Sequence, residues 1–578
     1  MAKIDLMFRI GGEAGQGVES SGAGFAKVLT RAGLHVFAVP SYYSRIRGGH
    51  NFYTLRVSDE PLEAISGRVD VLLAINAECV SRHLGDMARD GVIIVDADVA
   101  LDEDAAAESG VRLLRPDLLA IAEAHGGKVM LNTALLAYAA AVTGLDLAHI
   151  LGVIRDNFGK RAQSIAEANI QVAQAAFDLA QGEHAGLVQP PLGTQSAPER
   201  VVIDASHAFA MGALMAGCKF MAGYPMTPAT SVLEYYAKHA DDWGLVVKHA
   251  EDELAAINMC IGAAHAGVRA MTSTSGGGFD LMTEGLSLAG MAEIPVVVYL
   301  CQRPGPATGL ATRTAQGDLL MAIHASHGEF PRIVLAPHTP QEAYACAIRA
   351  HNLADRYQCP VIVLSDQYNA TSLWSIDADA FSLEDVPIER GALLQGQDLD
   401  AVEGYRRYCL SEDGISPRAV PGHANGVYLA TGNEHDEDGH LNEEPDVAVA
   451  MLDKRMEKLV KARSEMRPPL VLGPKEADVT LLSWGSSYGP VHEAMLRLNR
   501  AGGRFNMRHW VDLWPFPVEG SRAALAGAKR LVAVEGNGTG QFADLLAAQT
   551  DIRVDQRILK YDGRGLTSAF ILRHLEEA

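Results

Sequence analysis

Three consecutive carboxylates stand before a run of small and apolar residues near the middle of the chain. Glu251, Asp252 and Glu253 precede the sequence LAAINMCIGAAHAG, which ends at Gly267. Attraction to the positive end of a helix already explains acidic residues in a first turn. The predicted helix is apolar on nearly all sides, however, which is typical of a buried helix. A carboxyl group at its start is then partly removed from water and suits proton-sharing chemistry, so catalysis and simple helix stabilisation both stay open.

Two later loops carry hydroxyls and cations among glycines. Residues 271–282, MTSTSGGGFDLM, place Thr274 and Ser275 directly before three glycines, which let a ligand approach the backbone. A helix cap explains one hydroxyl there but not their density. Residues 302–319, QRPGPATGLATRTAQGDL, contain two cations, Arg303 and Arg313. Because ligands of open α/β sheets bind where strands end, either arginine can clamp a substrate carboxylate; an ion pair with a surface carboxylate is the alternative.

The N-terminal segment has a second glycine cluster and a pair of arginines. The cluster GGEAGQG at residues 11–17 follows a predicted strand and opens a predicted helix, where backbone N–H groups can hold an anion. Its spacing differs from the dinucleotide pattern GxGxxG, and a tight strand-to-helix turn explains it equally well. Arg45 and Arg47, in SYYSRIRGGHNF, can each grip a phosphate, or lie as solvated cations on a strand edge.

The sequence shows no metal-ligand spacing. The seven cysteines contain no CxxC pair, and the 20 histidines contain no HExxH. The segment EHDEDGH at 434–440 lacks the order of acidic residues that an EF-hand needs, so we expect a solvated loop there. We therefore expect no metal on this chain. An odd number of widely spaced cysteines also argues against disulfides and favours a reduced, cytoplasmic compartment.

Length and charge set the class of protein. The chain has 578 residues and a formal net charge of −22, which argues against binding to nucleic acid or to an anionic membrane. Its longest apolar run near the middle, residues 294–300, is too short to span a bilayer and is typical of a buried parallel strand. The N-terminus lacks the apolar segment of a signal peptide.

The elements that must position these residues alternate between short β-rich runs and helical patterns. This alternation predicts an α/β fold class, with layered domains built on mostly parallel sheets. We expect three α/β domains, at 1–190, 200–366 and 472–578. A linker rich in Gly and Pro follows the first domain, and a long connecting arm fills residues 367–471.

In combination, these motifs resemble one known family. AGYPMTPAT at 222–230, the segments around Glu253 and Arg313, LLSWGSSYGPVHEA at 481–494 and VAVEGNGTGQFADLL at 532–546 occur in the order found in 2-oxoacid:ferredoxin oxidoreductases. The resemblance is to α subunits with a fused γ domain, and it covers nearly the whole chain. One departure is Gly277, which stands where the family usually has proline in TSGPG.

The resemblance implies a role for each part of the chain. It makes 1–190 a γ-type domain, 200–366 a domain for the pyrimidine half of thiamine diphosphate, and 472–578 a transketolase-C-like domain. Glu253 becomes the carboxylate on N1′ of the aminopyrimidine, Thr227 a neighbour of the substrate's carboxylate and carbonyl, and Arg313 the carboxylate clamp. The implied cofactor contacts are Glu253, Tyr224, Pro225, Thr274 and Ser275, and the implied coenzyme A contacts are Gly12, Gly15, Gly17, Arg45 and Arg47.

The resemblance also implies what a partner must supply. The chain lacks the GDG…Asn loop for Mg²⁺ and the diphosphate, and it lacks a cysteine set for a [4Fe–4S] cluster. In this family both belong to a separate β subunit, so we expect a dimer of αβ heterodimers that transfers electrons to ferredoxin. The expected reaction is reversible: 2-oxoglutarate, coenzyme A and oxidised ferredoxin give succinyl-CoA, CO₂ and reduced ferredoxin, and the reverse direction fixes CO₂ as in a reductive TCA cycle.

Several alternatives stay open. The substrate can be pyruvate or a broad set of 2-oxoacids. The chain can also belong to another class of thiamine-diphosphate enzyme, such as a transketolase or a non-ferredoxin 2-oxoacid dehydrogenase. A non-catalytic module that binds a nucleotide at the N-terminal glycines is the third possibility, but it leaves the Thr227 and Glu253 motifs unexplained.

Overall fold

The computed structural model describes residues 3–43, 48–65, 67–159, 162–384 and 386–576. The chain forms two compact units. The first comprises Met1–Asp204, Thr371–Ala380 and Thr567–Ala569, and the second comprises Ala205–Ala370, Phe381–Leu566 and Phe570–Ala578. Among the described residues, no helix combines the length and the apolar character needed to cross a membrane.

The first unit is built on an eight-stranded mixed sheet. In spatial order its strands are β6 (Arg112–Leu114), β5 (Met87–Val95), β4 (Val69–Ala74), β1 (Asp5–Glu13), β3 (His50–Ser58), β2 (His35–Ser41), β14 (Leu373–Asp377) and β7 (Arg200–Ile203). The strands from β6 to β1 are parallel, whereas every pairing from β1 to β7 is antiparallel. The expectation of a mostly parallel sheet is therefore wrong for this unit, because β3, β2, β14 and β7 add an antiparallel half.

Two strands of this sheet come from outside the range predicted for the first domain. We expected β7 at the start of the second domain and β14 in the connecting arm. Instead β14 pairs with both β2 and β7. Trp374 packs edge-on against Phe37 with ring centroids 4.8 Å apart, and the backbone N–H of Val36 donates to Ser375 Oγ at 2.8 Å. A buried aromatic contact thus accompanies the backbone pairing of a segment far away in sequence.

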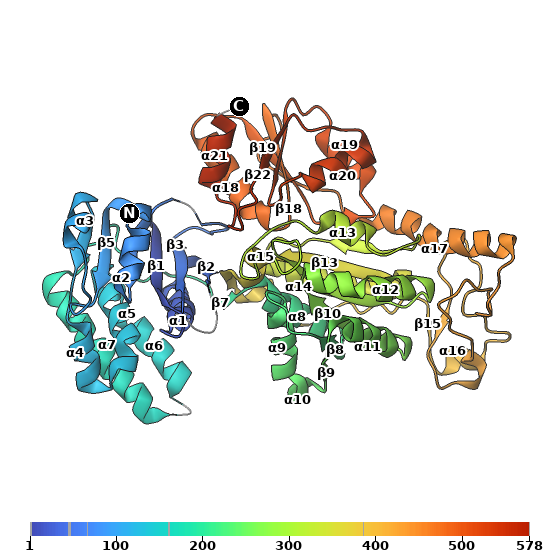
Figure 1. Ribbon diagram of the computed structural model, residues 1–578, viewed down its shortest axis with the longest axis horizontal. Helices are drawn as coiled ribbons and strands as arrows, with labels where there is room; N and C mark the ends of the chain where they lie inside the picture. The colour runs from blue at the N-terminus through green and yellow to red at the C-terminus, as the bar shows by residue number, and fades with distance from the viewer. Residues whose placement is uncertain (1–2, 44–47, 66, 160–161, 385, 577–578) are drawn as a thin grey trace. The chain divides into compact units, whose positions relative to one another are not determined.

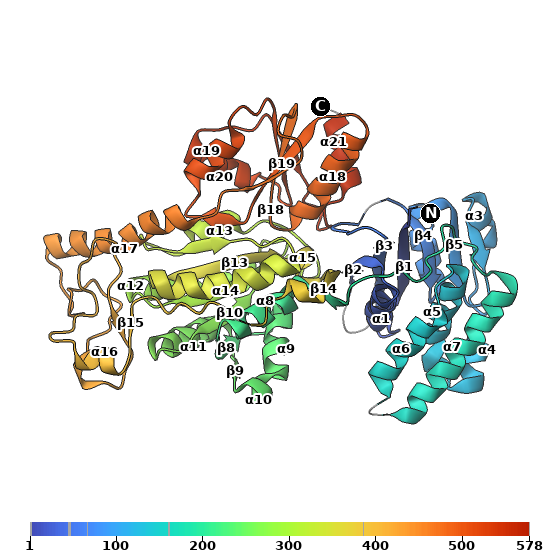
Figure 2. The same cartoon turned by 180° about the vertical axis from the view of Figure 1, so that it is seen from behind.

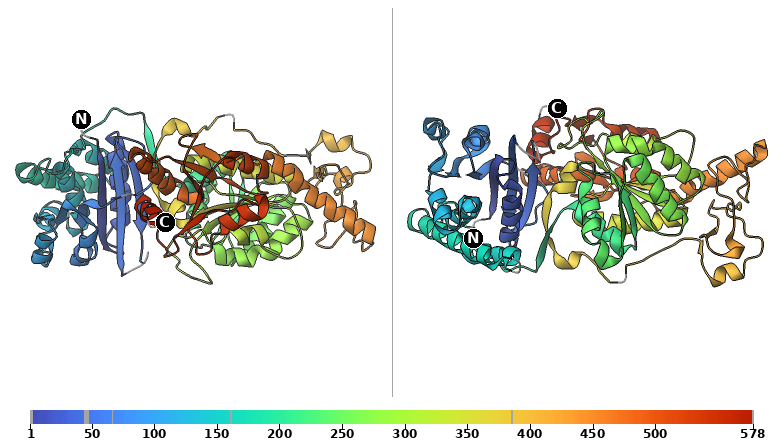
Figure 3. Two further views of the ribbon diagram at one scale, coloured as in Figure 1. Left: turned by 90° about the horizontal axis from the view of Figure 1, so that it is seen from above. Right: turned by 60° about the horizontal axis from the view of Figure 1, so that its bottom comes forward.

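Helices cover the sheet of the first unit on both faces of its parallel half. Along β4, Val71 and Leu73 pack into one core, while Leu72 and Ala74 pack into the other, as expected when side chains alternate along a strand. Figures 1 and 3 show the larger group of helices lying together beside the blue strands. The helices are α1 (Val18–Arg31), α2 (Ala77–His83), α3 (Glu103–Glu108), α4 (Leu118–His125), α5 (Leu131–Val142), α6 (Leu147–Phe158) and α7 (Gln163–Glu183).

The second unit contains a seven-stranded sheet that positions the candidate site. In order its strands are β20 (Asp512–Trp514), β12 (Ile333–Leu335), β13 (Pro360–Asp366), β11 (Val296–Gln302), β10 (Ala270–Thr274), β8 (Phe220–Gly223) and β9 (Val246–His249). All pairings are parallel except that of β20 with β12. The central strands β10, β11 and β13 are buried along their whole length, which explains the apolar runs that open β11 and β13.

Helices enclose this sheet from both sides. Gly212 of α8 (Ala205–Met215) permits close packing against α14 (Pro340–Tyr357), since a Cβ there would lie 2.3 Å from the carbonyl oxygen of Tyr344. Helices α11 (Glu253–His265) and α12 (Gly276–Met291) pack against each other. The remaining helices of this part are α9 (Thr230–Lys238), α10 (Ala240–Trp243), α13 (Leu319–His324) and α15 (Gln367–Thr371).

A second sheet of this unit lies in the C-terminal part of the chain. Its order is β17 (Leu470–Leu472), β19 (Phe505–Trp510), β18 (Val479–Trp484), β21 (Leu531–Glu535) and β22 (Gln556–Leu559), with helices α18 (Tyr488–Arg500), α19 (Val518–Leu525), α20 (Gln541–Thr550) and α21 (Ser568–Glu576). β19 ends at Trp510, and β20, which follows it directly, pairs with β12 of the seven-stranded sheet. The C-terminal part thereby contributes an edge strand to the larger sheet.

The connecting arm projects from this unit and ends in a long helix. Figure 2 shows its loops and the short helix α16 (Gln397–Asp400) beside the outer end of α17 (Pro445–Glu465). The arm also contains the short strands β15 (Leu393–Leu394) and β16 (Arg418–Ala419). Lys454 and Lys458 of α17 both donate to the carboxylate of Glu293, and all three side chains are buried. Burial alone would raise the pKa of Glu293, but the two lysines lower it below its ordinary value.

The segment at 434–440 is only partly the solvated loop that we expected. His435 is fully buried, with its ring 4.1 Å from that of Tyr408, and Glu434 forms an ion pair with Arg455 of α17. The prediction is therefore wrong for these first two residues. Their contacts come from distant parts of the arm, which the local sequence does not reveal.

Candidate active site

Four adjacent parallel strands of the second unit end at one edge, and the chemistry-bearing loops follow them there. Thr227 lies in the turn after β8, Glu253 opens α11 after β9, Thr274 ends β10, and Arg303 follows β11. Because β9, β8, β10 and β11 are neighbours in the sheet, these four residues gather at its carboxyl edge. The sequence indicated a ligand site only at the end of β11; the gathering of the four loops follows from the order of the strands in the sheet.

Glu253 has the environment of a functional carboxylate. The side chain of its neighbour Asp252 caps α11 by accepting from the N–H of Ala255 at 2.8 Å, so Glu253 itself is not needed as the cap. Glu253 is only 2% exposed, and its Oε1 has no hydrogen-bond partner among the residues that the structure describes. A buried carboxylate oxygen without a partner is costly, which indicates that it awaits a ligand.

The first turn of α12 leaves space for this carboxylate because Gly278 has no side chain. A Cβ on Gly278 would lie 2.4 Å from Glu253 Oε1 and 2.1 Å from Thr274 Oγ1. Only glycine therefore lets the carboxylate approach the positive end of α12. Gly277, one position earlier, is different: a Cβ there would meet nothing closer than the carbonyl oxygen of Ala307 at 3.6 Å.

The two hydroxyls predicted at this turn are both fully buried. Thr274 Oγ1 contacts the carbonyl oxygen of Ser275 at 3.3 Å and the sulfur of Met226 at 3.9 Å. Ser275 precedes α12 but forms no side-chain cap, and its Oγ has no partner within the described part of the chain. The cap interpretation of Ser275 is therefore wrong, and its hydroxyl is available to a ligand.

The structure distinguishes the two arginines of the 302–319 loop. Arg303 Nη1 donates to the carbonyl oxygen of Thr227 at 2.7 Å, and burial lowers the pKa of Arg303 while Glu253 and Asp318 raise it. Arg313 instead lies against the C-terminal loop, where a Cβ on Gly563 would be 3.1 Å from its Cβ, and burial together with Arg564 lowers its pKa. Arg303 is thus the arginine whose charge acts on Glu253.

A second carboxyl group at this turn was missed by the sequence analysis. A Cβ on Gly276 would lie 2.8 Å from Oδ2 of Asp318, and that oxygen has no partner among the described residues. Burial and the nearby Asp280 raise the pKa of Asp318 to about 6, against the opposing effect of Arg303. Asp318 lies in the 302–319 motif, but an aspartate in a polar loop gives no signal of burial.

The C-terminal part of the chain fixes the end of the same loop. Gln316 donates to the carbonyl oxygen of Trp484 and accepts from the N–H of Gly536, both at 2.7 Å. The backbone carbonyl oxygen of Gln316 accepts from the side-chain amide of Asn537 at 3.1 Å. The motifs around Trp484 and Asn537 therefore position the loop that carries Arg303, Arg313 and Asp318.

Tyr224 and Pro225, the other predicted cofactor contacts, lie in the turn before Thr227. Both are exposed, with 40% of Tyr224 accessible and its ring 6.2 Å from that of His249. They lie at the same edge of the sheet as Glu253, on the outer side of the site.

The glycines predicted at the N-terminus lie in the first unit. Gly12 lies near the end of β1. Gly15 and Gly17 follow this strand and have φ angles of +91° and +74°, which only glycine adopts readily. Gly15 and Gly17 line a cavity of about 820 Å³, together with Asn132, Asp96 and other residues. Arg45 and Arg47 lie outside the described residues.

Comparison with known proteins identifies the family. Residues 211–454 match the family model of pyruvate flavodoxin/ferredoxin oxidoreductase, thiamine diphosphate-binding, and residues 7–179 match that of pyruvate ferredoxin/flavodoxin oxidoreductase. The chain is 35% identical to 2-oxoacid:ferredoxin oxidoreductase 2, subunit alpha, of Aeropyrum pernix, covering 98% of this chain and 96% of that protein. It is 29% identical to the 2-oxoglutarate oxidoreductase subunit KorA of Mycobacterium tuberculosis, covering 99% and 91%.

A solved structure matches the chain over its whole length. It is the 2-oxoglutarate:ferredoxin oxidoreductase from Magnetococcus marinus with 2-oxoglutarate, coenzyme A and succinyl-CoA bound. The TM-score is 0.92 at 33% identity, and the match covers 99% of each chain. With a curated relative above 30% identity over nearly its full length, this chain belongs to the 2-oxoacid:ferredoxin oxidoreductases, as an alpha subunit with a thiamine diphosphate-binding domain.

Proposed function

We propose that this alpha subunit serves a coenzyme A-dependent oxidoreductase whose substrate is 2-oxoglutarate and whose electron acceptor is ferredoxin. The products are succinyl-CoA, CO₂ and reduced ferredoxin, and the reaction is reversible, so that it can also fix CO₂. The KorA name of one relative and the bound ligands of the Magnetococcus structure support this substrate. Pyruvate or a broad set of 2-oxoacids is the alternative, because several relatives are named only for 2-oxoacids.

The observation that carries the proposal is the unpartnered oxygen of Glu253. Its buried carboxylate lies at the start of α12, where Gly278 faces both Glu253 Oε1 and Thr274 Oγ1, and it fits the nitrogen-rich aminopyrimidine of thiamine diphosphate. The cofactor, when bound, supplies a thiazolium that accepts the electrons released by decarboxylation. We propose that Glu253, Ser275, Thr274, Tyr224 and Pro225 hold only the pyrimidine half.

The residues of this chain have separate tasks in the proposed site. Glu253 would hold the pyrimidine N1′ and share a proton with it. Arg303 fixes the turn that carries Thr227 through the carbonyl oxygen that it binds, and so orients Thr227 toward the carboxylate and carbonyl of the substrate. Arg313 clamps a substrate carboxylate. The deep burial of Glu253 keeps water from competing for its free oxygen.

The remaining assignments concern partners. We propose that a separate β subunit holds Mg²⁺, the diphosphate and a [4Fe–4S] cluster, and that two αβ heterodimers assemble. The subunit names of the relatives support further chains in the complex. Coenzyme A contacts are proposed at Gly12, Gly15, Gly17, Arg45 and Arg47. The domain boundaries 1–190, 200–366, 367–471 and 472–578, and the cytoplasmic location, stay predictions.

The test compares Glu253→Gln with Glu251→Gln in the reconstituted complex. Gln keeps the size of the side chain but removes the charge that favours proton sharing, so Glu253→Gln should lower 2-oxoglutarate-dependent dye reduction by at least 100-fold. Glu251 is exposed two positions away, and its variant should keep the wild-type rate. Retention of more than a tenth of the activity by Glu253→Gln would reject the assigned role.

A second measurement separates the substrate and the enzyme class. The ratio of kcat/KM for 2-oxoglutarate to that for pyruvate should favour 2-oxoglutarate, and a ratio near or below one would support the broad or pyruvate-specific alternative. Reduction of ferredoxin distinguishes the proposal from a lipoamide- or sugar-dependent thiamine enzyme. The purified chain alone should show no activity, and full activity without a partner would contradict the proposed β subunit.

A further inference from the structure

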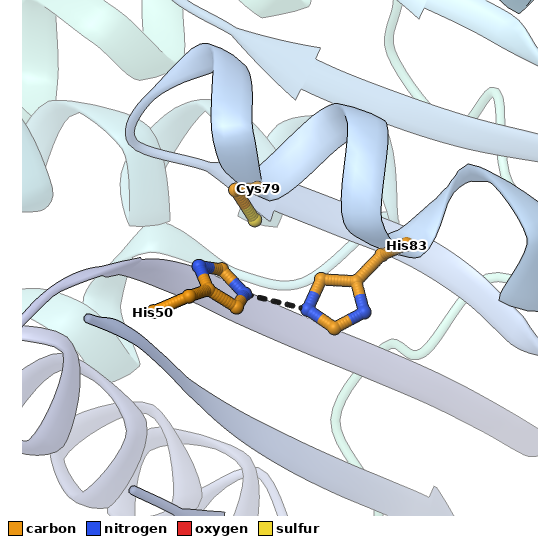
Figure 4. A group of neighbouring side chains, drawn as sticks. All are labelled: His50, Cys79 and His83. Atoms are coloured by element: carbon orange, nitrogen blue, oxygen red, sulfur yellow. Dashed lines mark hydrogen bonds between the residues drawn. The ribbon is translucent and has the colours of Figure 1, made fainter. Parts of the chain in front are cut away.

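Three buried side chains of the first unit converge although two different elements carry them. Cys79 and His83 are four residues apart on α2, so they share one face of the helix, and His50 begins β3. Figure 4 shows the three side chains pointing toward one another. One ligand atom of each residue lies within 4.8 Å of the others, and all three residues are buried. Two imidazoles and a thiol are a ligand set that zinc binds.

The two imidazoles face each other through nitrogens that cannot both carry a proton. Nε2 of His50 is 2.7 Å from Nε2 of His83, so one of them presents a lone pair to the other. Nδ1 of His50 is buried and has no partner among the described residues. His50 is therefore buried with one of its two ring nitrogens unpaired, which is unusual for a histidine whose only role is to support the fold.

Two charged side chains fix the ring of His83. Its Nδ1 lies 3.2 Å from Oδ2 of Asp86 and 2.9 Å from Nη1 of Arg9, and Arg9 also pairs with Asp86. Because Arg9 can only donate, Nδ1 accepts from it in the metal-free chain, and Nε2–H of His83 donates to Nε2 of His50. A zinc ion on Nε2 would move this proton to Nδ1, where the carboxylate of Asp86 accepts it and orients the ring.

We propose that His50, Cys79 and His83 together bind one Zn²⁺ ion. Tetrahedral zinc with Zn–N distances of about 2.0–2.1 Å needs the two nitrogens roughly 3.3 Å apart. The rings must therefore separate by about half an ångström from their present contact, a shift that side-chain rotation supplies. Gly11 lines the site, because a Cβ there would lie 2.5 Å from the sulfur of Cys79. Binding replaces the thiol proton, which leaves to solvent, by a zinc–thiolate bond, and a non-protein ligand completes the tetrahedron.

The test measures zinc in the purified full-length chain after dialysis against a weak chelator. We expect one zinc per chain, reduced at least tenfold by Cys79→Ser and by His83→Gln. Cys218→Ser is the matched control, since Cys218 is equally buried but lies in the second unit, and it should keep the zinc. Gly11→Ala should weaken binding by filling the site while leaving all three ligands in place.

A measurement on the unaltered chain is independent of whether the variants fold. Titration with Co²⁺ should give the near-ultraviolet charge-transfer absorption of a cobalt–thiolate bond, saturating at one equivalent, and Zn²⁺ should abolish it. No saturable signal and no retained zinc would overturn the proposal and leave a proton-sharing histidine pair. Zinc retained equally by folded Cys79→Ser and His83→Gln variants would also overturn it. Iron or magnesium in a co-purified partner does not affect either readout.

Discussion

Gly278→Ala tests whether the first turn of α12 positions Glu253. The added Cβ would lie 2.4 Å from Glu253 Oε1 and 2.1 Å from Thr274 Oγ1, whereas ordinary contacts begin near 3.4 Å. Glu253 must therefore withdraw by 1.0 Å and Thr274 Oγ1 by 1.3 Å, the differences between these distances. Thr274 can rotate its side chain. Glu253, at 2% exposure, has little space into which it can retreat.

The expected loss follows from this displacement. A misplacement of about 1 Å at a catalytic group costs about 100-fold in rate, equivalent to about 2.7 kcal/mol of transition-state stabilisation. We expect the loss chiefly in kcat, because the residues that bind the rest of the cofactor and substrate are unchanged. Gly277→Ala is the control one residue away, where the nearest atom is at 3.6 Å. It should keep the rate and stabilise the helix by up to about 1 kcal/mol.

The assay is 2-oxoglutarate-dependent dye reduction by the complex reconstituted with its partner subunit. Circular dichroism and melting temperature establish that each variant is folded, and calorimetric titration with thiamine diphosphate measures cofactor binding separately. A Gly278→Ala enzyme that is folded and retains a third or more of the wild-type kcat would refute the reasoning. Equal losses in Gly277→Ala and Gly278→Ala would show that α12 tolerates no side chain there, whatever Glu253 does.

Three further predictions concern named contacts of the second unit. Arg303→Ala should lower kcat at least tenfold by freeing the Thr227 turn, while Arg313→Ala should mainly raise KM for the 2-oxoacid; the reverse pattern in steady-state kinetics would exchange their roles. Asp318 holds its proton more tightly in the native protein than in the unfolded chain, because its native pKa is about 6, so its contribution to stability declines as pH rises from about 4 to about 6. Asp318→Asn should remove this decline, which is worth up to about 3 kcal/mol. If the melting temperatures of variant and wild type change with pH in parallel from pH 4.5 to 7, the prediction is contradicted. Asp355 is buried and accepts from Arg269, Arg390 and Arg418, so Asp355→Ala should destabilise by about 3–5 kcal/mol, and an unchanged melting temperature would argue against this.

Part of the candidate active site follows from the sequence. The 302–319 loop follows the apolar run that forms β11, and ligands of such sheets bind where strands end. The loops of Thr227 and Glu253 follow the short strands β8 and β9, and only the strand order shows that they lie at the same edge. Asp318 and the orientation of Arg303 could not be predicted, because both depend on which atoms the folded loop brings against α12 and Thr227. Hydroxyl density near Ser275 indicated a ligand, whereas its burial without a cap needed the structure.

The long-range strand pairings were harder to predict for a physical reason. β14 and β20 are short and each pairs with strands far away in sequence, so local alternation says little about their partners. The same reason hides the group of His50, Cys79 and His83, since β3 and α2 are brought together only by the sheet. Spacing alone led us to expect no metal on this chain, because metal motifs in sequence are mostly local.

The return of Thr371–Ala380 to the first unit has a practical consequence for dissecting the protein. A fragment that ends near residue 190 retains the glycine loop but lacks both β7 and β14, so the outer edge of β2 loses its neighbour and the ring of Phe37 loses Trp374. An unpaired edge strand of this kind invites association with other chains. Expression of the N-terminal part by itself should therefore include the 371–380 strand, joined by a designed linker, if the isolated fragment is to remain monomeric.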